Sequence, residues 1–381
     1  MKKLNLLLLG LIITVSLTAQ THRGTLIAKV DQMLESALEK EHVYNAFLSI
    51  YSPSKDFEWH VAKGAFKDGR KVTTEHPYYT ASIGKTFTAS GIGILADQGK
   101  LQFDDPIAKY LSDEIMSGLH VLIGTDYGDS IRISHLLQHT SGLPDYFDEQ
   151  TTDGSPGIFD LIMTKPDQFW QPATLIAFSK AHFRPSFPPG QGYFYTDTEY
   201  VLLGMIIENI SALELHEFFA KNIFVPLAMH HTYLNLRSEA LQPTGKIAEI
   251  YADDFEISQL RSLSADWAGG AIVSTGKDLI IFMEALMDGE IVSNETLQAM
   301  QQWIPETQGM TYGYGLRKIN FAELSPGLPD WEVIGHSGLN GTSMYYCPDL
   351  DIYLAGTLNQ LSSSKEAVAL ALEVLMEFRE L

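Results

Sequence analysis

The pattern of hydrophobic and polar positions predicts strands at both ends of the chain. Strand-like runs bounded by turn residues occur at 45–52, 57–64, 332–335, 343–346 and 352–357. A helical repeat precedes the first of these strands, at 26–40, and another follows the last one, at 366–380. This arrangement predicts one antiparallel sheet that is made from both ends of the chain.

The part of the chain between these strands is predicted to be mainly helical. Apolar residues recur at helical spacing in eight segments, which are 82–98, 104–111, 131–139, 173–180, 200–210, 213–224, 277–287 and 295–302. The segment 145–171 is acidic and rich in loop residues, and we expect it to form an insertion or a lid. The predicted fold class is therefore α/β (α+β), with a central antiparallel sheet flanked by helices and an all-helical lobe inserted at roughly 100–260.

The first 19 residues have the three parts of a secretory signal peptide. Lys2 and Lys3 form a basic start, the segment 4–17 is mostly apolar, and 17–19 offers a small-residue cleavage site. No cysteine follows that site, which argues against a lipid anchor, and no later segment has the length and apolarity of a membrane span. We expect the domain 20–381 to be exported, either to the periplasm or as a secreted protein.

Charge and cysteine content restrict the partners of the protein. The formal net charge is -21, which argues against nucleic acid and anionic membrane surfaces as partners. Cys347 is the single cysteine, so an intrachain disulfide cannot form and the apolar core has to hold the fold. We therefore expect the partner to be a small-molecule or peptide substrate.

The first candidate for chemistry is the pair of Ser82 and Lys85 at the start of a predicted helix. Residues three apart lie on one face of a helix, so the hydroxyl and the amine are expected to meet there. A lysine that is desolvated can lose its charge and act as the base that a serine nucleophile needs. The same spacing occurs after Ser52, Ser274 and Ser362, where a turn or a helix cap explains the serine. A helix cap is also the alternative for Ser82.

Two further stretches contain side chains that can move protons. Tyr195 lies in an aromatic cluster before a predicted helix, and a tyrosine can relay a proton when a nearby cation lowers its pKa. Its alternative is a purely structural aromatic core. His336 lies between Gly335 and Gly338, where glycines allow a ligand to approach the backbone. The alternative for His336 is a solvated histidine in a hairpin turn.

His135 and His139 are four residues apart in a predicted helix. That spacing can bind zinc, but Leu136 stands where the H-E-x-x-H motif has its glutamate. We therefore expect both histidines to have structural roles and to bond to the backbone.

Taken in order, these stretches resemble the serine β-lactamase and penicillin-binding superfamily, in particular its class C branch. That superfamily has S-x-x-K, then Y-x-N, then K-T-G or H-x-G, and this chain has 82–85, 195–197 and 336–338 in the same order. The resemblance covers roughly 46–359 and includes the stretches 98–101, 136–144, 226–229 and 268–270.

The resemblance implies a site between the sheet and the helical lobe, and an acyl-enzyme mechanism that needs no metal or cofactor. It implies that Ser82 attacks a carbonyl group, that Lys85 and Tyr195 share the role of base, and that His336 assists Tyr195 and binds an acidic group of the substrate. The oxyanion hole would consist of the backbone N–H groups of Ser82 and Leu339. The residues that it implies for substrate binding are Asp197, Ser337, Gly338 and Leu339.

Two departures from the motifs bear on the substrate. His336 replaces a lysine and holds a carboxylate less firmly near neutral pH. Asp197 replaces an asparagine, so an amide donor is lost. An ionised Asp197 is expected to face the carbonyl group of the substrate's side-chain amide with a like partial charge, which disfavours acylamino substrates such as penicillins. The alternatives are that Asp197 pairs with Lys85 and keeps it protonated, that it receives a cationic substrate group such as a free D-amino terminus, or that it only braces its own loop.

We therefore expect an exported serine hydrolase that acts on an ester, a peptide with a D-residue or an acyl amide. A true β-lactamase or a D-alanyl-D-alanine carboxypeptidase is the alternative within the same fold. A non-catalytic binding protein on this scaffold is the alternative of another class. An α/β-hydrolase is disfavoured because the chain has no G-x-S-x-G motif.

Overall fold

The computed structural model describes residues 22–361 and 363–380, so the predicted signal peptide at 1–19 lies outside the described residues. In the described part, an eight-stranded antiparallel sheet has the order β10-β11-β12-β13-β14-β15-β1-β2. Its strands are β1 (Asn45–Ser52), β2 (Phe57–Gly64), β10 (Ile304–Thr307), β11 (Met310–Tyr312), β12 (Arg317–Asn320), β13 (Glu332–Ser337), β14 (Ser343–Cys347) and β15 (Ile352–Thr357). Because β1 pairs with β15, both ends of the chain share one sheet, as predicted.

The sheet is covered on both faces, and the alternation along β1 accounts for this. Leu48 contributes to an apolar cluster with a helix at 22–38 and with α13 (Ser364–Phe378). The next residue toward the N-terminus, Phe47, belongs to the other apolar cluster. That second face is covered by α10 (Gly276–Met287), which contacts β1, β14 and β15. Successive side chains point to opposite faces of a strand, so one strand contributes to two cores.

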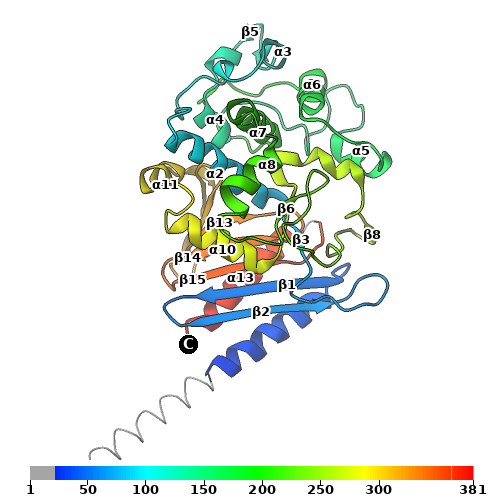
Figure 1. Ribbon diagram of the computed structural model, residues 1–381, viewed down its shortest axis with the longest axis vertical. Coiled ribbons are helices and arrows are strands. Elements are labelled where there is room, and N and C mark those ends of the chain that lie inside the picture. Colours follow the sequence, from blue (N-terminus) through cyan, green and yellow to red (C-terminus); the bar gives the residue numbers. More distant parts are fainter. Residues whose placement is uncertain (1–21, 362, 381) are drawn as a thin grey trace, which may run out of the picture.

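Figure 1 shows the helices gathered on one side of this sheet, with β2 and the helix 22–38 at the opposite end. They are α2 (Gly84–Asp97), α3 (Asp113–Met116), α4 (Ile133–Leu137), α5 (Ile158–Thr164), α6 (Pro172–His182), α7 (Asp197–Ser211), α8 (Leu215–Phe219), α9 (Trp267–Gly270) and α11 (Asn294–Met300). The short helix α12 (Phe321–Leu324) packs instead in the apolar cluster of the helix 22–38. The buried helix α2 contacts α7 and α9, which both contribute to the candidate site. In the described part of the chain, no helix is long and apolar enough to cross a membrane.

Several predicted elements are wrong in detail. Strands β10 to β12 were not predicted, because they have only three or four residues each and few apolar side chains. The expected helix 131–139 is only the short α4, and His139 lies beyond it with a left-handed φ of 60°. The expected helix 213–224 ends as α8 and continues as a π-helical turn, Ala220–Phe224. At 104–111 only one 3-10 turn forms, Ile107–Lys109.

A small sheet holds the segment that leads to Ser82. It has the order β3-β9-β6, with β3 at Tyr78–Tyr79, β9 at Ile272–Ser274 and β6 at Tyr233–Leu234. Thr80 follows β3 and donates hydrogen bonds from its backbone N–H and its hydroxyl to the carbonyl oxygen of Ile272, both at 2.9 Å. The backbone is therefore held firmly two residues before Ser82.

Candidate active site

Ser82 lies in a 3-10 turn, Ala81–Ile83, that leads directly into α2. The preceding residue, Ala81, has a left-handed φ of 46°, which an L-residue adopts at a cost. Ser82 is partly exposed, whereas Ile83 and Lys85 are completely buried. The turn therefore presents the hydroxyl to solvent at the N-terminal end of a buried helix, where backbone N–H groups favour negative charge.

Glycines allow α9 to approach this turn closely. A Cβ atom on Gly84 would lie 2.7 Å from the Cα atom of Gly270. A Cβ atom on Gly270 would in turn lie 2.8 Å from the carbonyl carbon of Ala81. Neither distance leaves room for a side chain, so both glycines are needed to bring α9 against the Ser82 turn.

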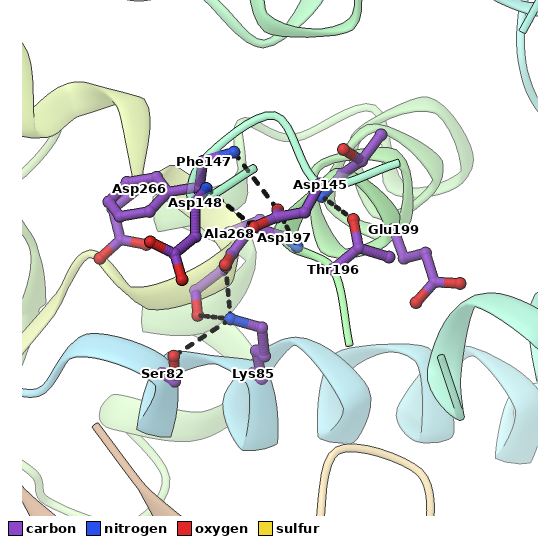
Figure 2. Close-up of polar contacts among 12 residues, drawn as sticks. Ser82, Lys85, Asp145, Phe147, Asp148, Thr196, Asp197, Glu199, Asp266 and Ala268 are labelled. Carbon is purple, nitrogen blue, oxygen red and sulfur yellow. Dashed lines mark hydrogen bonds and ion pairs between the residues drawn. The ribbon is translucent and has the colours of Figure 1, made fainter. Parts of the chain in front are cut away.

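Lys85 is fully buried and joins three parts of the chain. Its Nζ donates hydrogen bonds to Ser82 Oγ and to the carbonyl oxygen of Gly269, each at 3.2 Å. It also forms an ion pair with Asp197, and Figure 2 shows the amine between the serine and this carboxylate. The meeting of hydroxyl and amine thus occurs as helical spacing predicts.

The charge state of Lys85 is not the one expected from burial. Burial by itself lowers the pKa of Lys85, but the charges of Asp197, Tyr195 and Asp266 and the hydrogen bond to Asp197 together outweigh it, so that the pKa is raised above its ordinary value. The expectation of a lysine ready to lose its charge is therefore wrong for the resting site. Of the alternatives for Asp197, the structure has the one in which it pairs with Lys85.

Asp197 is the first residue of α7, three residues before the start predicted for that helix. Its backbone N–H donates to Asp145 Oδ1 at 2.9 Å, and Asp145 also accepts from the backbone N–H groups of Phe147 and Asp148 (Figure 2). Burial, followed by the charge of Asp197, raises the pKa of Asp145 to about 7. Asp145 was not among the predicted site residues, although it directly follows the stretch 136–144.

Tyr195 lies beside the serine and the lysine. Its ring centre is 4.9 Å from Lys85 Nζ, and its hydroxyl shares a hydrogen bond with Ser82 that favours the phenolate. Burial nevertheless raises the pKa of Tyr195, against the opposing positive charge of Lys85. The resting side chain is therefore a neutral phenol next to the candidate nucleophile.

His336 lies within β13, completely buried, so the alternative of a solvated hairpin turn is wrong. Its Nε2 is 3.0 Å from the hydroxyl of Tyr312, and its ring centre is 6.3 Å from that of Tyr195. Burial, with the positive charges of Arg317 and Lys85, holds the pKa of His336 well below its usual value. A neutral imidazole carries no charge for an acidic substrate group, which weakens the role expected from the resemblance.

The cation nearest to Tyr195 besides Lys85 is Arg317, on the unpredicted strand β12. Its guanidinium carbon lies 5.6 Å from the centre of the Tyr195 ring, and Nη1 donates to Ser337 Oγ at 3.4 Å. Two hydrogen bonds of 2.6 Å join Arg317 to Glu306 on β10. This pair was not predicted, because neither β10 nor β12 was predicted.

His139 forms a buried pair with Glu199 of α7 and packs against the aromatic rings of the site. Its ring centre is 4.3 Å from that of Tyr195 and 4.7 Å from that of Tyr312. Burial lowers the pKa of His139 and raises that of Glu199, so both groups are neutral. The structural role expected for His139 agrees with this packing, although the helix expected to carry it does not form there.

The last expected substrate-binding residues follow His336 at the end of β13. A Cβ atom on Gly338 would lie 2.8 Å from the carbonyl oxygen of Thr80 and from the Cβ atom of Ala81, so the end of this strand touches the Ser82 turn. Leu339 is 42 % exposed and lines the same pocket as Ser82. The oxyanion role of its backbone N–H stays a prediction.

The pocket beside Ser82 has a volume of about 420 Å³. Its walls are largely apolar, and much of them comes from the predicted lid, which contains α5. The apolar lining residues include Phe147, Phe159, Ile162, Met163, Phe194, Ile250, Ile257 and Leu263. Carboxylates form most of the polar lining, namely Asp145, Asp148, Glu149, Asp197 and Asp266. Among the described residues that line the pocket there is no lysine, arginine or histidine.

Solved structures with this fold include a D-amino acid amidase from Ochrobactrum anthropi SV3. It has a TM-score of 0.77 and 24 % sequence identity, and the match covers 93 % of this chain and 99 % of the amidase. A D-stereospecific amidohydrolase from Streptomyces sp. has a TM-score of 0.72 and 26 % identity over 90 % of this chain and 97 % of its own. These neighbours establish the fold.

Two curated proteins are similar in sequence. Penicillin-binding protein 4* of Bacillus subtilis (strain 168) is 25 % identical over 332 residues, which cover 81 % of this chain and 65 % of that protein. A putative D-alanyl-D-alanine carboxypeptidase of Escherichia coli O157:H7 is 25 % identical over 304 residues, 71 % of this chain and 66 % of its own length. The chain thus spans about two thirds of these relatives. The Beta-lactamase family model matches residues 30–375, and the chain therefore belongs to the Beta-lactamase family.

Proposed function

We propose that the protein is an exported serine hydrolase that acts through an acyl-enzyme on esters, D-residue peptides or acyl amides. The observation that carries this proposal is the contact of Lys85 Nζ with both Ser82 Oγ and the carboxylate of Asp197, at a pocket that Ser82 and Tyr195 line. A non-catalytic binding protein has no need for this arrangement. Relatives and neighbours that are described as a carboxypeptidase and amidases support the same class of reaction.

In the proposed mechanism, Lys85 and Asp197 act together as the base. Lys85 Nζ passes one proton to Asp197 as it takes the proton of Ser82 Oγ, because the resting lysine is already charged. Oγ then bonds to the carbonyl carbon, and the leaving group departs with a proton from Tyr195. The proton held by the Asp197 and Lys85 pair is then passed to Tyr195, which becomes a neutral phenol again. A water molecule attacks the acyl-enzyme in the second half of the reaction, by the same proton transfers.

The lining of the pocket bears on the substrate. Arg317 is already paired with Glu306, His336 is neutral, and the described lining residues include no lysine, arginine or histidine. A substrate carboxylate therefore meets several carboxylates and no free cation, which disfavours penicillins and carboxypeptidase substrates. Esters and amides without a negative charge near the scissile bond fit the pocket better.

The test of this proposal is labelling with a fluorophosphonate probe, which reacts with activated serines. We expect the purified protein to be labelled at Ser82, as located by mass spectrometry, and Ser82→Ala to abolish labelling. Ser274→Ala, at a serine with the same motif spacing, is the control and should be labelled normally. Absence of labelling in the natural protein would favour the binding-protein alternative, and labelling that persists in Ser82→Ala would place the nucleophile elsewhere.

A second expected result concerns Asp197 and the β-lactamase alternative. Asp197→Asn restores the amide donor of the family motif and is expected to raise kcat/KM for nitrocefin relative to p-nitrophenyl acetate by about ten-fold, the worth of one hydrogen bond to a polar partner. Both rates are also expected to fall, because the variant removes the proton acceptor behind Lys85. An unchanged ratio of the two rates would show that Asp197 does not select the substrate.

A further inference from the structure

Asp266 is a carboxylate of the pocket that the mechanism above does not use. It directly precedes α9, is partly exposed and lines the pocket together with Ser82. Its Oδ2 accepts a hydrogen bond of 2.8 Å from the hydroxyl of Tyr79. Within the described residues it forms no ion pair, in contrast to Asp197, which is paired with Lys85. Asp266 therefore offers a negative charge to the pocket without a fixed cation to neutralise it.

The glycines of α9 show how close this carboxylate is to the reacting groups. A Cβ atom on Gly270 would lie 2.4 Å from Asp266 Oδ2 and 2.8 Å from the carbonyl carbon of Ala81. A Cβ atom on Gly269 would lie 2.5 Å from Asp197 Oδ1 and 3.6 Å from Asp266 Oδ1. Asp266 thus lies against the residue before Ser82 on one side and faces Asp197 on the other.

The balance of charge around Asp266 favours a bound cation. The ionisable groups that face it are Tyr79, Asp197, Lys85 and Tyr146, and Lys85 is the single positive group among them. Burial, and after it the charge of Asp197, raises the pKa of Asp266 to about 7. Asp197 is paired with Lys85, so an ionised Asp266 leaves this group of residues with one negative charge that no ion pair compensates. A cation placed there is therefore attracted to Asp266.

We propose that Asp266 determines specificity by receiving the α-ammonium group of an aminoacyl substrate whose apolar side chain packs against the pocket wall of Phe147, Phe159 and Ile257. An amino acid amide, ester or short peptide with a free amino terminus has its ammonium group on the carbon next to the scissile carbonyl. Asp266 lies beside the Ser82 turn, so it is placed to meet a charged group on the carbon next to the carbonyl that Ser82 attacks. This inference rests on the proposed function and names its substrate class.

The test compares two substrates that differ in one amino group. D-phenylalanine p-nitroanilide has the α-ammonium group, and 3-phenylpropionyl p-nitroanilide lacks it. Asp266→Asn keeps an acceptor for Tyr79 and is expected to lower kcat/KM by about ten-fold or more for the first substrate and by less than about two-fold for the second. Asp167→Asn removes an exposed acid outside the pocket and should leave the ratio of the two rates unchanged.

Fluorophosphonate labelling separates failure of this inference from failure of the proposed function. If Asp266→Asn is labelled at Ser82 at the normal rate and the ratio of the two substrates does not change, Asp266 does not bind the amino group. If the natural protein is not labelled and hydrolyses neither substrate, the proposed function is wrong.

The natural protein gives an independent measurement should the variant fold poorly. Phenethylamine stays charged near neutral pH, whereas 2-phenylethanol is uncharged. Asp266 and Asp145 both line this pocket, and both are protonated below a pKa of about 7. Inhibition by the amine is therefore expected to strengthen as the pH rises from about 6 to about 8, while inhibition by the alcohol stays constant. Equal inhibition by both compounds at every pH would overturn the inference.

Discussion

Lys85→Met is expected to lower the rate of acylation by about a thousand-fold or more, since a base that acts as a unit with its nucleophile contributes at least this much. Methionine fills the same buried volume but cannot carry the proton between Ser82 and Asp197. The rate of fluorophosphonate labelling and the burst with p-nitrophenyl acetate both report this step.

The chain contains a matched control for this variant. Lys277 follows Ser274 with the same spacing, but it is exposed on α10 and does not line the pocket. Lys277→Met should change the acylation rate by less than about two-fold, as a surface substitution does. If Lys85→Met retains near-normal labelling with a folded spectrum, Lys85 is not part of the base.

Asp197→Ala is expected to lower the free energy of unfolding by about 3–5 kcal/mol, the usual cost of leaving one member of a buried ion pair alone. Lys85 is completely buried, and the carboxylate of Asp197 is the single acidic partner with which it forms an ion pair in the described chain. Denaturant unfolding at neutral pH measures the loss. Folding raises the pKa of Lys85 above 10.5, so the contribution of the lysine is present throughout the neutral range and fades only at strongly alkaline pH.

A double-mutant cycle separates this pair from other effects of the alanine. Adding Lys85→Met to Asp197→Ala removes the unpaired charge, and we expect the double variant to recover a substantial part of the lost stability. Lys109→Met breaks the exposed pair with Asp105 and should cost less than about 1 kcal/mol. If Asp197→Ala costs no more than Lys109→Met, the buried pair does not stabilise the fold.

Local pattern alone predicted a large part of this protein. Helical spacing predicted Ser82 beside Lys85, because the contact spans only one turn, from the 3-10 turn of Ser82 into the start of α2. Strand-like runs at both ends of the chain, in β1, β2 and the last three strands, likewise predicted a sheet that joins both chain ends. Tyr195 was predicted to lie in the same site because the order of the motifs resembles that of a known family. The residues around Tyr195 do not predict this by themselves.

The unpredicted parts depend on contacts between distant segments. Strands β10 and β12 have little apolar alternation. The sequence therefore did not predict the pair of Glu306 and Arg317 that lies beside Tyr195. The burial of His336 depends on its neighbours in the folded sheet, and its neutral state follows from that burial.

The charge of the site was decided by tertiary structure alone. The local sequence predicted a desolvated lysine that loses its proton, but the fold brings Asp197, which is 112 residues away in the chain, against it. It also brings Asp266 close to the same glycine, Gly269, and in the described chain Asp266 has no ion-pair partner. A pattern of apolar residues determines which faces are buried, whereas the protonation of a buried group depends on the sum of all charges packed around it, and that sum exists only in the folded chain.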